Sequence, residues 1–348
     1  MRKKNIVLVS LVIAGLISLP FLSSSVQAQG AKVYKWRMQS FFGPGSPAYD
    51  ESLPRFIQNV KTLSNGQIDI TLYPPSALVP SFELFNNMGK GVVDMGLDAG
   101  TYWMGFLPIG ELIWGWPFTF QHKQEHDYFY NVMGGVDILR KATATRGVYV
   151  LVNAVHNKYG SITSRVPIKG LKDLKGLKIR SFSVYAKIMQ RFGSSTMTIP
   201  GEEMYTALAT KVLDGITWGA PADSGAFKLY EAAKYYTMPA WHPQSPLTVT
   251  MNLKTWQGLP DHLKSILQTA ANAYAEDVAA RTWYKDAATL EEWVKNKGVI
   301  VNWFSDEDMK TARKISLELL DEKAKQDAFC NEHVTLLKKS LKTFGYID

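Results

Sequence analysis

The chain is poor in the features that mark many enzymes, disulfide-stabilised proteins and nucleic-acid-binding proteins. Its 348 residues include one cysteine, Cys330, so no intramolecular disulfide can form. The sequence has no G-x-S-x-G, H-E-x-x-H, G-x-G-x-x-G or Walker motif. The formal net charge is +8, but basic and acidic residues are mixed, without the basic stripe of a nucleic-acid-binding surface. These absences favour binding of a small molecule over catalysis.

Apolar runs of membrane length are absent after the N-terminus. Residues 6–22 form an apolar run, preceded by basic residues at positions 2–4 and followed by V-Q-A at 26–28. This order is typical of a secretory signal peptide, which we assign to residues 1–28. An uncleaved membrane anchor is the alternative, because the run is near the lower limit for a membrane span.

The rest of the chain alternates strand and helix patterns. Residues 33–40 and 67–73 alternate apolar and polar side chains, and residues 50–63 between them have helical spacing. Ser183 and Ser305 are expected to cap the helices that follow them. Further strands are predicted at 91–99, 148–155, 177–180, 196–199, 247–252 and 299–303, and further helices at 81–90, 124–140, 184–192, 200–212, 226–233, 260–295 and 305–342. This order predicts an α/β protein, and about 320 residues after the leader exceed what one core usually supports.

Candidate ligand-binding residues gather at strand ends. Arg180 ends a short apolar strand, and its planar guanidinium can donate two parallel hydrogen bonds to one carboxylate. The alternative is an ordinary surface arginine. Tyr102 and Trp103 follow the strand at 91–99, where ligands of open α/β sheets bind, so they are candidate pocket walls or ordinary core.

Four segments resemble the solute-binding proteins of tripartite ATP-independent periplasmic (TRAP) transporters. They are LSNGQIDITLYPPSAL (63–78), LKGLKIR (174–180), IPGEEMYTALATKVLDG (199–215) and MNLKTWQGLP (251–260). The resemblance implies a two-lobed, periplasmic-binding-protein-like α/β fold with crossing hinge strands and a long helix spanning both lobes. It also implies a binding protein rather than an enzyme.

The same resemblance implies a domain organisation and partners. The first lobe is expected at residues 29–150 and the second at 151–250. Residues 251–348 are expected to supply the spanning helix, a returning strand and a C-terminal helical segment. The protein would work in the periplasm and deliver a small organic carboxylate to membrane permease subunits, without nucleic acid. It would be a monomer or a helix-exchanged dimer.

Within this family, the chain is similar to the branch that binds 2-oxo or 2-hydroxy monocarboxylates with a metal ion. WRMQS at 36–40 and Trp218 in DGITWGAP carry this similarity. In that branch a glutamate precedes the tryptophan and ligates the cation, whereas this chain has Thr217 there. A neutral hydroxyl balances a cation less well than a carboxylate does.

The expected site follows from these matches. Arg180 would pair with the substrate carboxylate, and Trp218 and Tyr102 would form walls. Polar contacts are expected from Asn157, Tyr159, Thr217 and His242. If Na⁺ or Ca²⁺ is bound with the substrate, the candidate ligands are Thr217, the Trp218 backbone carbonyl and Asn157. The abundant aromatic residues permit a larger or aromatic carboxylate as an alternative, and use as the input of a sensor is another.

Overall fold

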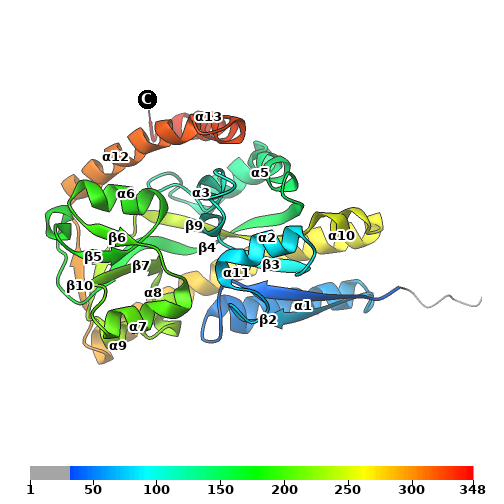
Figure 1. Ribbon diagram of the computed structural model, residues 1–348, viewed down its shortest axis with the longest axis horizontal. Helices are drawn as coiled ribbons and strands as arrows, with labels where there is room; N and C mark the ends of the chain where they lie inside the picture. The colour runs from blue at the N-terminus through cyan, green and yellow to red at the C-terminus, as the bar shows by residue number, and fades with distance from the viewer. Residues whose placement is uncertain (1–31, 348) are drawn as a thin grey trace, which may run out of the picture. The chain divides into compact units, whose positions relative to one another are not determined.

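A mixed β-sheet forms the centre of the protein (Figure 1). The computed structural model describes residues 32–347, except for the side chain of Asn157, so the expected signal peptide at residues 1–28 lies outside the described residues. Within that range ten strands join in one sheet: β1 (Tyr34–Ser40), β2 (Ile68–Tyr73), β3 (Met95–Asp98), β4 (Val148–Ser164), β5 (Lys178–Arg180), β6 (Ser195–Met197), β7 (Gly215–Gly219), β8 (Tyr235–Met238), β9 (His242–Asn252) and β10 (Ile300–Trp303). Their order is β2-β1-β3-β9-β4-β7-β5-β6, with β8 paired to β4 and β10 paired to β8.

The helices fill the connections between these strands. The α-helices are α1 (Leu53–Leu63), α2 (Leu84–Gly89), α3 (Gly110–Ile113), α4 (Lys123–Asp127), α5 (Gly135–Ala144), α6 (Ser183–Arg191), α7 (Met204–Ala209), α8 (Pro221–Ala226), α9 (Leu229–Ala232), α10 (Leu253–Gln257), α11 (Asp261–Asn296), α12 (Asp306–Ala324) and α13 (Ala328–Thr343). Shorter π- or 3₁₀-turns are η1 (Ala48–Ser52), η2 (Ser81–Glu83), η3 (Gly100–Tyr102), η4 (Tyr128–Val132), η5 (Leu171–Leu174) and η6 (Gly201–Glu203). None of the described helices combines the length and hydropathy needed to cross a membrane.

Two long strands connect the two ends of the sheet. The first part of β4 pairs antiparallel with β9, and its last part pairs with β7 from Tyr159–Gly219 to Ser164–Gly215. The far side of β9 pairs with β3. The β1–β3 group and the β5–β7 group are therefore joined through β4 and β9, which are buried along most of their length, as expected for central strands.

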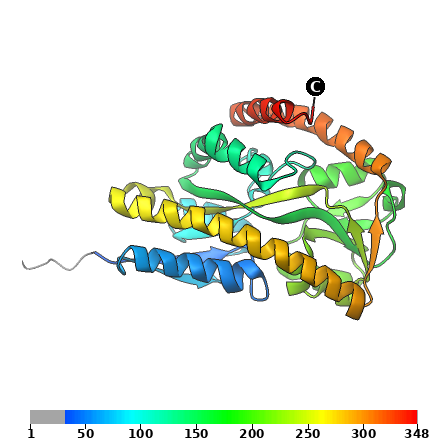
Figure 2. The ribbon, with the colours of Figure 1, turned by 180° about the vertical axis from the view of Figure 1, so that it is seen from behind.

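The helix α11 crosses the back of the sheet (Figure 2). Its 36 residues correspond to about 54 Å at 1.5 Å per residue. It contacts β4 and also the helices α1 and α8, which pack on β2 and β7 respectively. The α/β class and the long helix predicted from the sequence are confirmed, while the lobe boundaries at residues 150 and 250 stay predictions.

Some predicted elements differ from the structure for local reasons. The helix expected at 124–140 is broken before Gly135, because Gly134 adopts a positive φ of 94°. The last helix is interrupted after α12, and the Asp327 side chain then caps α13. Ser305 caps α12 as predicted. The prediction that Ser183 is an N-cap is wrong, because the N-cap position is Phe182 and the Ser183 hydroxyl donates instead to Glu111.

Candidate functional site

Arg180 is completely buried at the end of β5. Its Nε and Nη2 donate to the Ile199 carbonyl oxygen at 3.1 and 3.0 Å, and its Nη1 donates to the Thr217 carbonyl oxygen at 2.7 Å. A guanidinium has five N–H groups; three form these bonds, and the Tyr159 hydroxyl also hydrogen-bonds to the guanidinium, so a ligand would share the remaining donors with Tyr159. The two backbone carbonyls thus fix the orientation of the guanidinium without occupying all of its N–H groups.

No acidic side chain in the described part of the chain forms an ion pair with Arg180. The rings of Phe182 and Trp218 lie against the guanidinium, with its Cζ atom 4.3 and 4.7 Å from the two ring centroids. Cation–π contacts stabilise a charge by about 0.5–2 kcal/mol, less than the several kcal/mol that burial of an uncompensated ion costs. The site therefore holds positive charge that an anion would compensate.

Aromatic rings enclose the space beside Arg180. Phe41 stacks on Trp218 with centroids 5.3 Å apart, and Tyr102 lies 5.0 Å from Phe41 and 6.2 Å from Phe182. The remaining cavity has a volume of about 20 Å³. It is lined by Phe41, Phe42, Trp114, Tyr159, Phe182, Trp218, Gly219, Ser245 and Leu247. Such a volume admits about one water molecule, so a ligand can enter only after these rings separate.

Hydrogen bonds between distant segments accompany this closure. The Glu202 carboxylate accepts from the Ser76 and Ser81 hydroxyls at 2.6 and 3.0 Å. Ser46, in the turn after β1, donates to Asp223 of α8 at 2.9 Å. These contacts join the segments after β1 and β2 to the segments beside β6 and β7, and they stabilise the closed arrangement of the rings.

A hydroxyl network lies beside the guanidinium. The Tyr159 hydroxyl is 3.0 Å from the Thr217 hydroxyl and donates to the Thr217 carbonyl oxygen at 3.2 Å. The Thr217 hydroxyl lies 3.0 Å from the Ser181 hydroxyl and 3.1 Å from the Arg180 carbonyl oxygen. Both the hydroxyl and the carbonyl oxygen of Thr217 are therefore hydrogen-bonded to neighbouring protein groups.

The structure brings together four of the residues predicted from the sequence. Arg180 contacts Trp218 and Thr217, Thr217 contacts Tyr159, and Tyr102 belongs to the ring layer behind them. His242 does not line this cavity. It packs on Gly115, where an added Cβ atom would come within 1.9 Å of the His242 ring. The Asn157 side chain lies outside the described part.

Sequence reasoning missed Phe41, Phe42 and Trp114, which also line the cavity. The Phe41–Phe42 pair directly follows β1, and its place beyond the carboxyl end of a strand was the available signal. Ile199, whose carbonyl orients Arg180, gave no signal, because any residue type supplies a carbonyl.

A buried ion pair lies behind the ring layer. Lys323 Nζ of α12 is 2.7 Å from Glu111 Oε2 of α3, and both side chains are 4% exposed. The other Glu111 oxygen accepts from Ser183 at 2.7 Å. Since Ser183 follows Phe182, this chain of contacts connects the C-terminal helices to the ring that covers Arg180.

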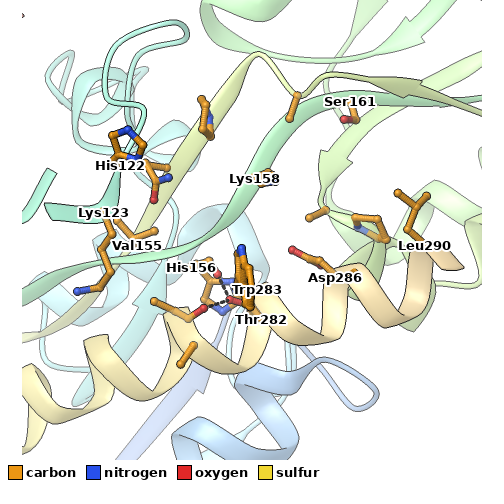
Figure 3. Close-up of a pocket in the computed structure, with 18 of the residues that line it drawn as sticks. His122, Lys123, Val155, His156, Lys158, Ser161, Thr282, Trp283, Asp286 and Leu290 are labelled. Atoms are coloured by element: carbon orange, nitrogen blue, oxygen red, sulfur yellow. Dashed lines mark hydrogen bonds between the residues drawn. The ribbon is translucent and has the colours of Figure 1, made fainter. Parts of the chain in front are cut away.

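A second, larger cavity lies between β4 and α11 (Figure 3). Its volume is about 700 Å³, and Lys158 of β4 and Asp286 of α11 lie on its walls. The ring of Trp283 is 71% exposed and stands at this cavity. The size suits a ligand, but its charged groups are of both signs and the lysine is exposed.

Asp98, at the end of β3, gives a testable pH dependence. Its side chain is buried, and burial raises the pKa of its carboxyl group to about 8, against the lowering effect of the Ala99 N–H. The folded protein therefore keeps a proton on Asp98 that the unfolded chain releases above about pH 4. The contribution of this proton to the free energy of unfolding is fully present below about pH 4 and is lost as the pH rises towards 8.

We expect the Asp98→Asn variant to remove this dependence. Relative to the variant, the wild-type free energy of unfolding should fall between about pH 5 and 8 by up to about 1.4 kcal/mol per pH unit. Burial lowers the pKa of His156 to about 3. Buried histidines of this kind change the free energy of unfolding below about pH 6.5, but they do so equally in both proteins. Urea unfolding of the pair across this range measures the difference, and a difference that stays constant with pH contradicts the assignment.

Comparison with known proteins adds to this geometry. Residues 38–327 match the family model described as "Bacterial extracellular solute-binding protein, family 7". A monocarboxylate 2-oxoacid-binding periplasmic protein of Nostoc sp. is 29% identical over 321 residues, which cover 88% of this chain and 83% of that protein.

Two solved structures share the fold. A TRAP periplasmic solute-binding protein from Colwellia psychrerythraea, with bound calcium and pyruvate, is 26% identical with a TM-score of 0.81, over 90% of this chain and 96% of that chain. A TRAP solute-binding protein from Bordetella bronchiseptica, a dimer with copurified calcium and picolinate, is 22% identical with a TM-score of 0.82, over 90% and 93% of the two chains.

Proposed function

Because this chain belongs to the DctP family of TRAP solute-binding proteins, which are not enzymes, we propose that it captures a small organic monocarboxylate of the 2-oxo or 2-hydroxy acid type. Arg180 pairs with the carboxylate, and the rings of Trp218 and Tyr102 close over the rest of the molecule. The loaded protein then delivers its ligand to membrane permease subunits in the periplasm. Monocarboxylate binding by the Nostoc relative and pyruvate in the Colwellia structure support this substrate class.

One observation carries the proposal. Arg180 is wholly buried, its fork is oriented by two backbone carbonyls, and no described acidic side chain compensates its charge. A structural arginine in a protein core is normally paired, because an isolated buried charge destabilises the fold. The N–H groups of the planar fork that are not bonded to the two carbonyls, together with the neighbouring Tyr159 hydroxyl, fit a carboxylate, which accepts several hydrogen bonds.

The rings around Arg180 support a second candidate within the same class of function. Phe41, Trp114, Phe182 and Trp218 line the cavity, and none of the residues lining it carries a charge. Aromatic surfaces bind flat apolar groups through offset stacking or edge-to-face contacts. A carboxylate with an aromatic or branched body therefore suits these walls once they separate.

A thermal-shift screen of carboxylates tests the proposal. Ligands that bind only the folded state raise the unfolding temperature, by an amount that increases with the logarithm of the ligand concentration relative to Kd. We expect stabilisation by members of a panel of pyruvate, lactate, 4-methyl-2-oxopentanoate, phenylpyruvate and benzoate, and none by the matched neutral amides. No stabilisation by any acid would contradict the proposal, and preference for phenylpyruvate or benzoate would select the second candidate.

The Lys158→Met variant separates the two cavities. Lys158 is an exposed cation on β4 that lines the larger cavity and not the small one beside Arg180. If Arg180 binds the carboxylate, removal of the Lys158 charge should change the dissociation constant by less than about twofold, since a solvent-exposed cation contributes little. Calorimetric titration of the best acid measures this. A loss of affinity above tenfold would instead place the carboxylate in the larger cavity.

Use as the input of a sensor is a different role for the same binding chemistry. Transport assays in vesicles distinguish them: we expect uptake of the bound acid only when both the permease and this protein are supplied. Binding without any permease-dependent uptake would favour signalling.

A further inference from the structure

Both Thr217 oxygen atoms, which were expected among the ligands of a cation, are already hydrogen-bonded within the protein. The Thr217 carbonyl oxygen lies 2.7 Å from Arg180 Nη1 and 3.2 Å from the Tyr159 hydroxyl. The Thr217 hydroxyl lies 3.0 Å from the hydroxyls of both Tyr159 and Ser181. The Arg180 guanidinium and the Tyr159 hydroxyl both donate to the Thr217 carbonyl oxygen and use its two lone pairs, while the Thr217 hydroxyl donates towards Ser181 and the Arg180 carbonyl oxygen.

The charge around Thr217 also opposes a cation. The nearest donor to its carbonyl is the guanidinium of Arg180, which is itself positive. None of the residues lining the adjoining cavity is acidic. Residues 32–347 contain no group of three or more histidine, cysteine, aspartate or glutamate side chains that could hold a metal ion. Hard cations such as Ca²⁺ are bound by several oxygen ligands that usually include carboxylates, so the residues present do not fit such an ion.

The Tyr159 hydroxyl is suited to replace an ion as a neutral donor. Burial raises the pKa of Tyr159, although the Arg180 charge and its hydrogen bonds act in the opposite direction. The phenol therefore keeps its proton at neutral pH. Its ring is held edge-on by Trp114, with centroids 4.1 Å apart, and by Tyr185, with centroids 4.9 Å apart. A fixed O–H donor beside a fixed guanidinium can serve a second oxygen of the ligand.

We infer that this chain binds its carboxylate without Na⁺ or Ca²⁺, unlike the calcium-containing relative from Colwellia. The inference rests on the proposed function, because it concerns the acid that Arg180 holds. The Arg180 guanidinium receives the carboxylate, and the Tyr159 hydroxyl turns its one proton from the Thr217 carbonyl oxygen to an oxygen on the adjacent carbon of a 2-oxo or 2-hydroxy acid. Thr217 and Ser181 act as positioning residues that hold the Tyr159 hydroxyl in place.

Calorimetric titration under defined cation conditions tests this inference. The protein is first dialysed against EDTA in a sodium-free Tris buffer, and the acid that gives the largest thermal shift is added as its Tris salt. Parallel titrations contain NaCl, CaCl₂ or choline chloride at matched ionic strength. We expect dissociation constants that agree within about twofold across all four conditions, which is a difference of less than about 0.5 kcal/mol.

The Tyr159→Phe variant provides the second arm. It removes one hydroxyl and keeps the ring, so we expect an affinity loss of roughly three- to tenfold for a 2-oxo acid, the usual size of one hydrogen bond. Addition of CaCl₂ should not restore the loss. The same substitution should change the affinity of a plain carboxylate, such as benzoate, by less than about twofold.

The outcomes separate this inference from the proposed function. A wild-type affinity that falls more than tenfold in EDTA and returns with Na⁺ or Ca²⁺ would overturn cation independence and leave carboxylate binding intact. Restoration of the Tyr159→Phe variant by CaCl₂ would do the same. If no acid binds under any cation condition, the proposed function itself fails.

Discussion

The Arg180→Met variant should lose at least about 2–5 kcal/mol of binding free energy, or roughly 30-fold to several thousandfold in affinity. Methionine has a similar length but no charge and no N–H group. A carboxylate that enters the closed cavity would then be desolvated without a partner, beside the rings of Phe182 and Trp218. Calorimetry on the wild type and the variant, with the same acid, measures the loss.

Folding of the variant can be separated from binding. Loss of the guanidinium removes donors from the Ile199 and Thr217 carbonyls, but it also removes a buried charge without a described counter-ion. We therefore expect a native circular dichroism spectrum and a cooperative unfolding transition. Arg180→Lys is the matched control, because lysine keeps the charge but cannot hold both carbonyls and a carboxylate with one planar fork. Its affinity should lie between those of the wild type and Arg180→Met.

The largest expected effect on stability comes from Lys323→Met. This substitution leaves the Glu111 carboxylate buried with the Ser183 hydroxyl, at 2.7 Å, as its remaining hydrogen-bond donor among the described side chains. Breaking one side of a buried ion pair typically destabilises a protein by about 3–5 kcal/mol. Urea unfolding of the variant and the wild type measures the change.

Two comparisons show whether burial causes this effect. Lys338 pairs with Asp321 on the surface, with side chains 40% and 56% exposed, so Lys338→Met should change stability by about 1 kcal/mol or less. Replacement of both partners, in Lys323→Met with Glu111→Gln, should recover much of the loss because no charge remains buried. Equal effects of Lys323→Met and Lys338→Met would contradict this account of the buried pair.

The repeating patterns of the sequence were enough to predict much of the fold. The helical spacing over 260–295 corresponds to α11 (Asp261–Asn296), and the alternation at 67–73 corresponds to β2 (Ile68–Tyr73). Both signals are local and repeat over many residues. Boundaries set by one residue, such as the break at Gly134, depend on a backbone angle that periodicity does not report.

The site could be predicted only in part, because its contacts join segments far apart in the chain. Arg180 could be found since its residue type and place at a strand end carry the chemistry. Its partners Ile199 and Thr217 act through backbone carbonyls, which no residue type reveals. The face presented by Tyr159 was also hidden, because β4 has irregularities on both sides of this residue, and each one shifts the alternation of side chains.

Whether a cation fits this site could be judged only from the three-dimensional arrangement. The sequence shows Thr217 where the resemblance leads one to expect a glutamate, but not what surrounds it. In the structure, Tyr159 and Ser181 occupy the neighbourhood of its hydroxyl, and Arg180 lies against its carbonyl. A single substitution would leave a weakened metal site, whereas these contacts place the positive Arg180 guanidinium and the neutral Tyr159 hydroxyl where a cation would bind.

The pairing of Arg180 with a carboxylate is tested most directly by a cycle of protein and ligand changes. Calorimetry compares the best acid with its neutral amide, in the wild type and in Arg180→Met. We predict that replacing the acid by the amide weakens binding to the wild type by at least about 2 kcal/mol and has little effect in the variant, so that the two changes are strongly coupled. An acid-to-amide penalty that is the same in both proteins would contradict the pairing.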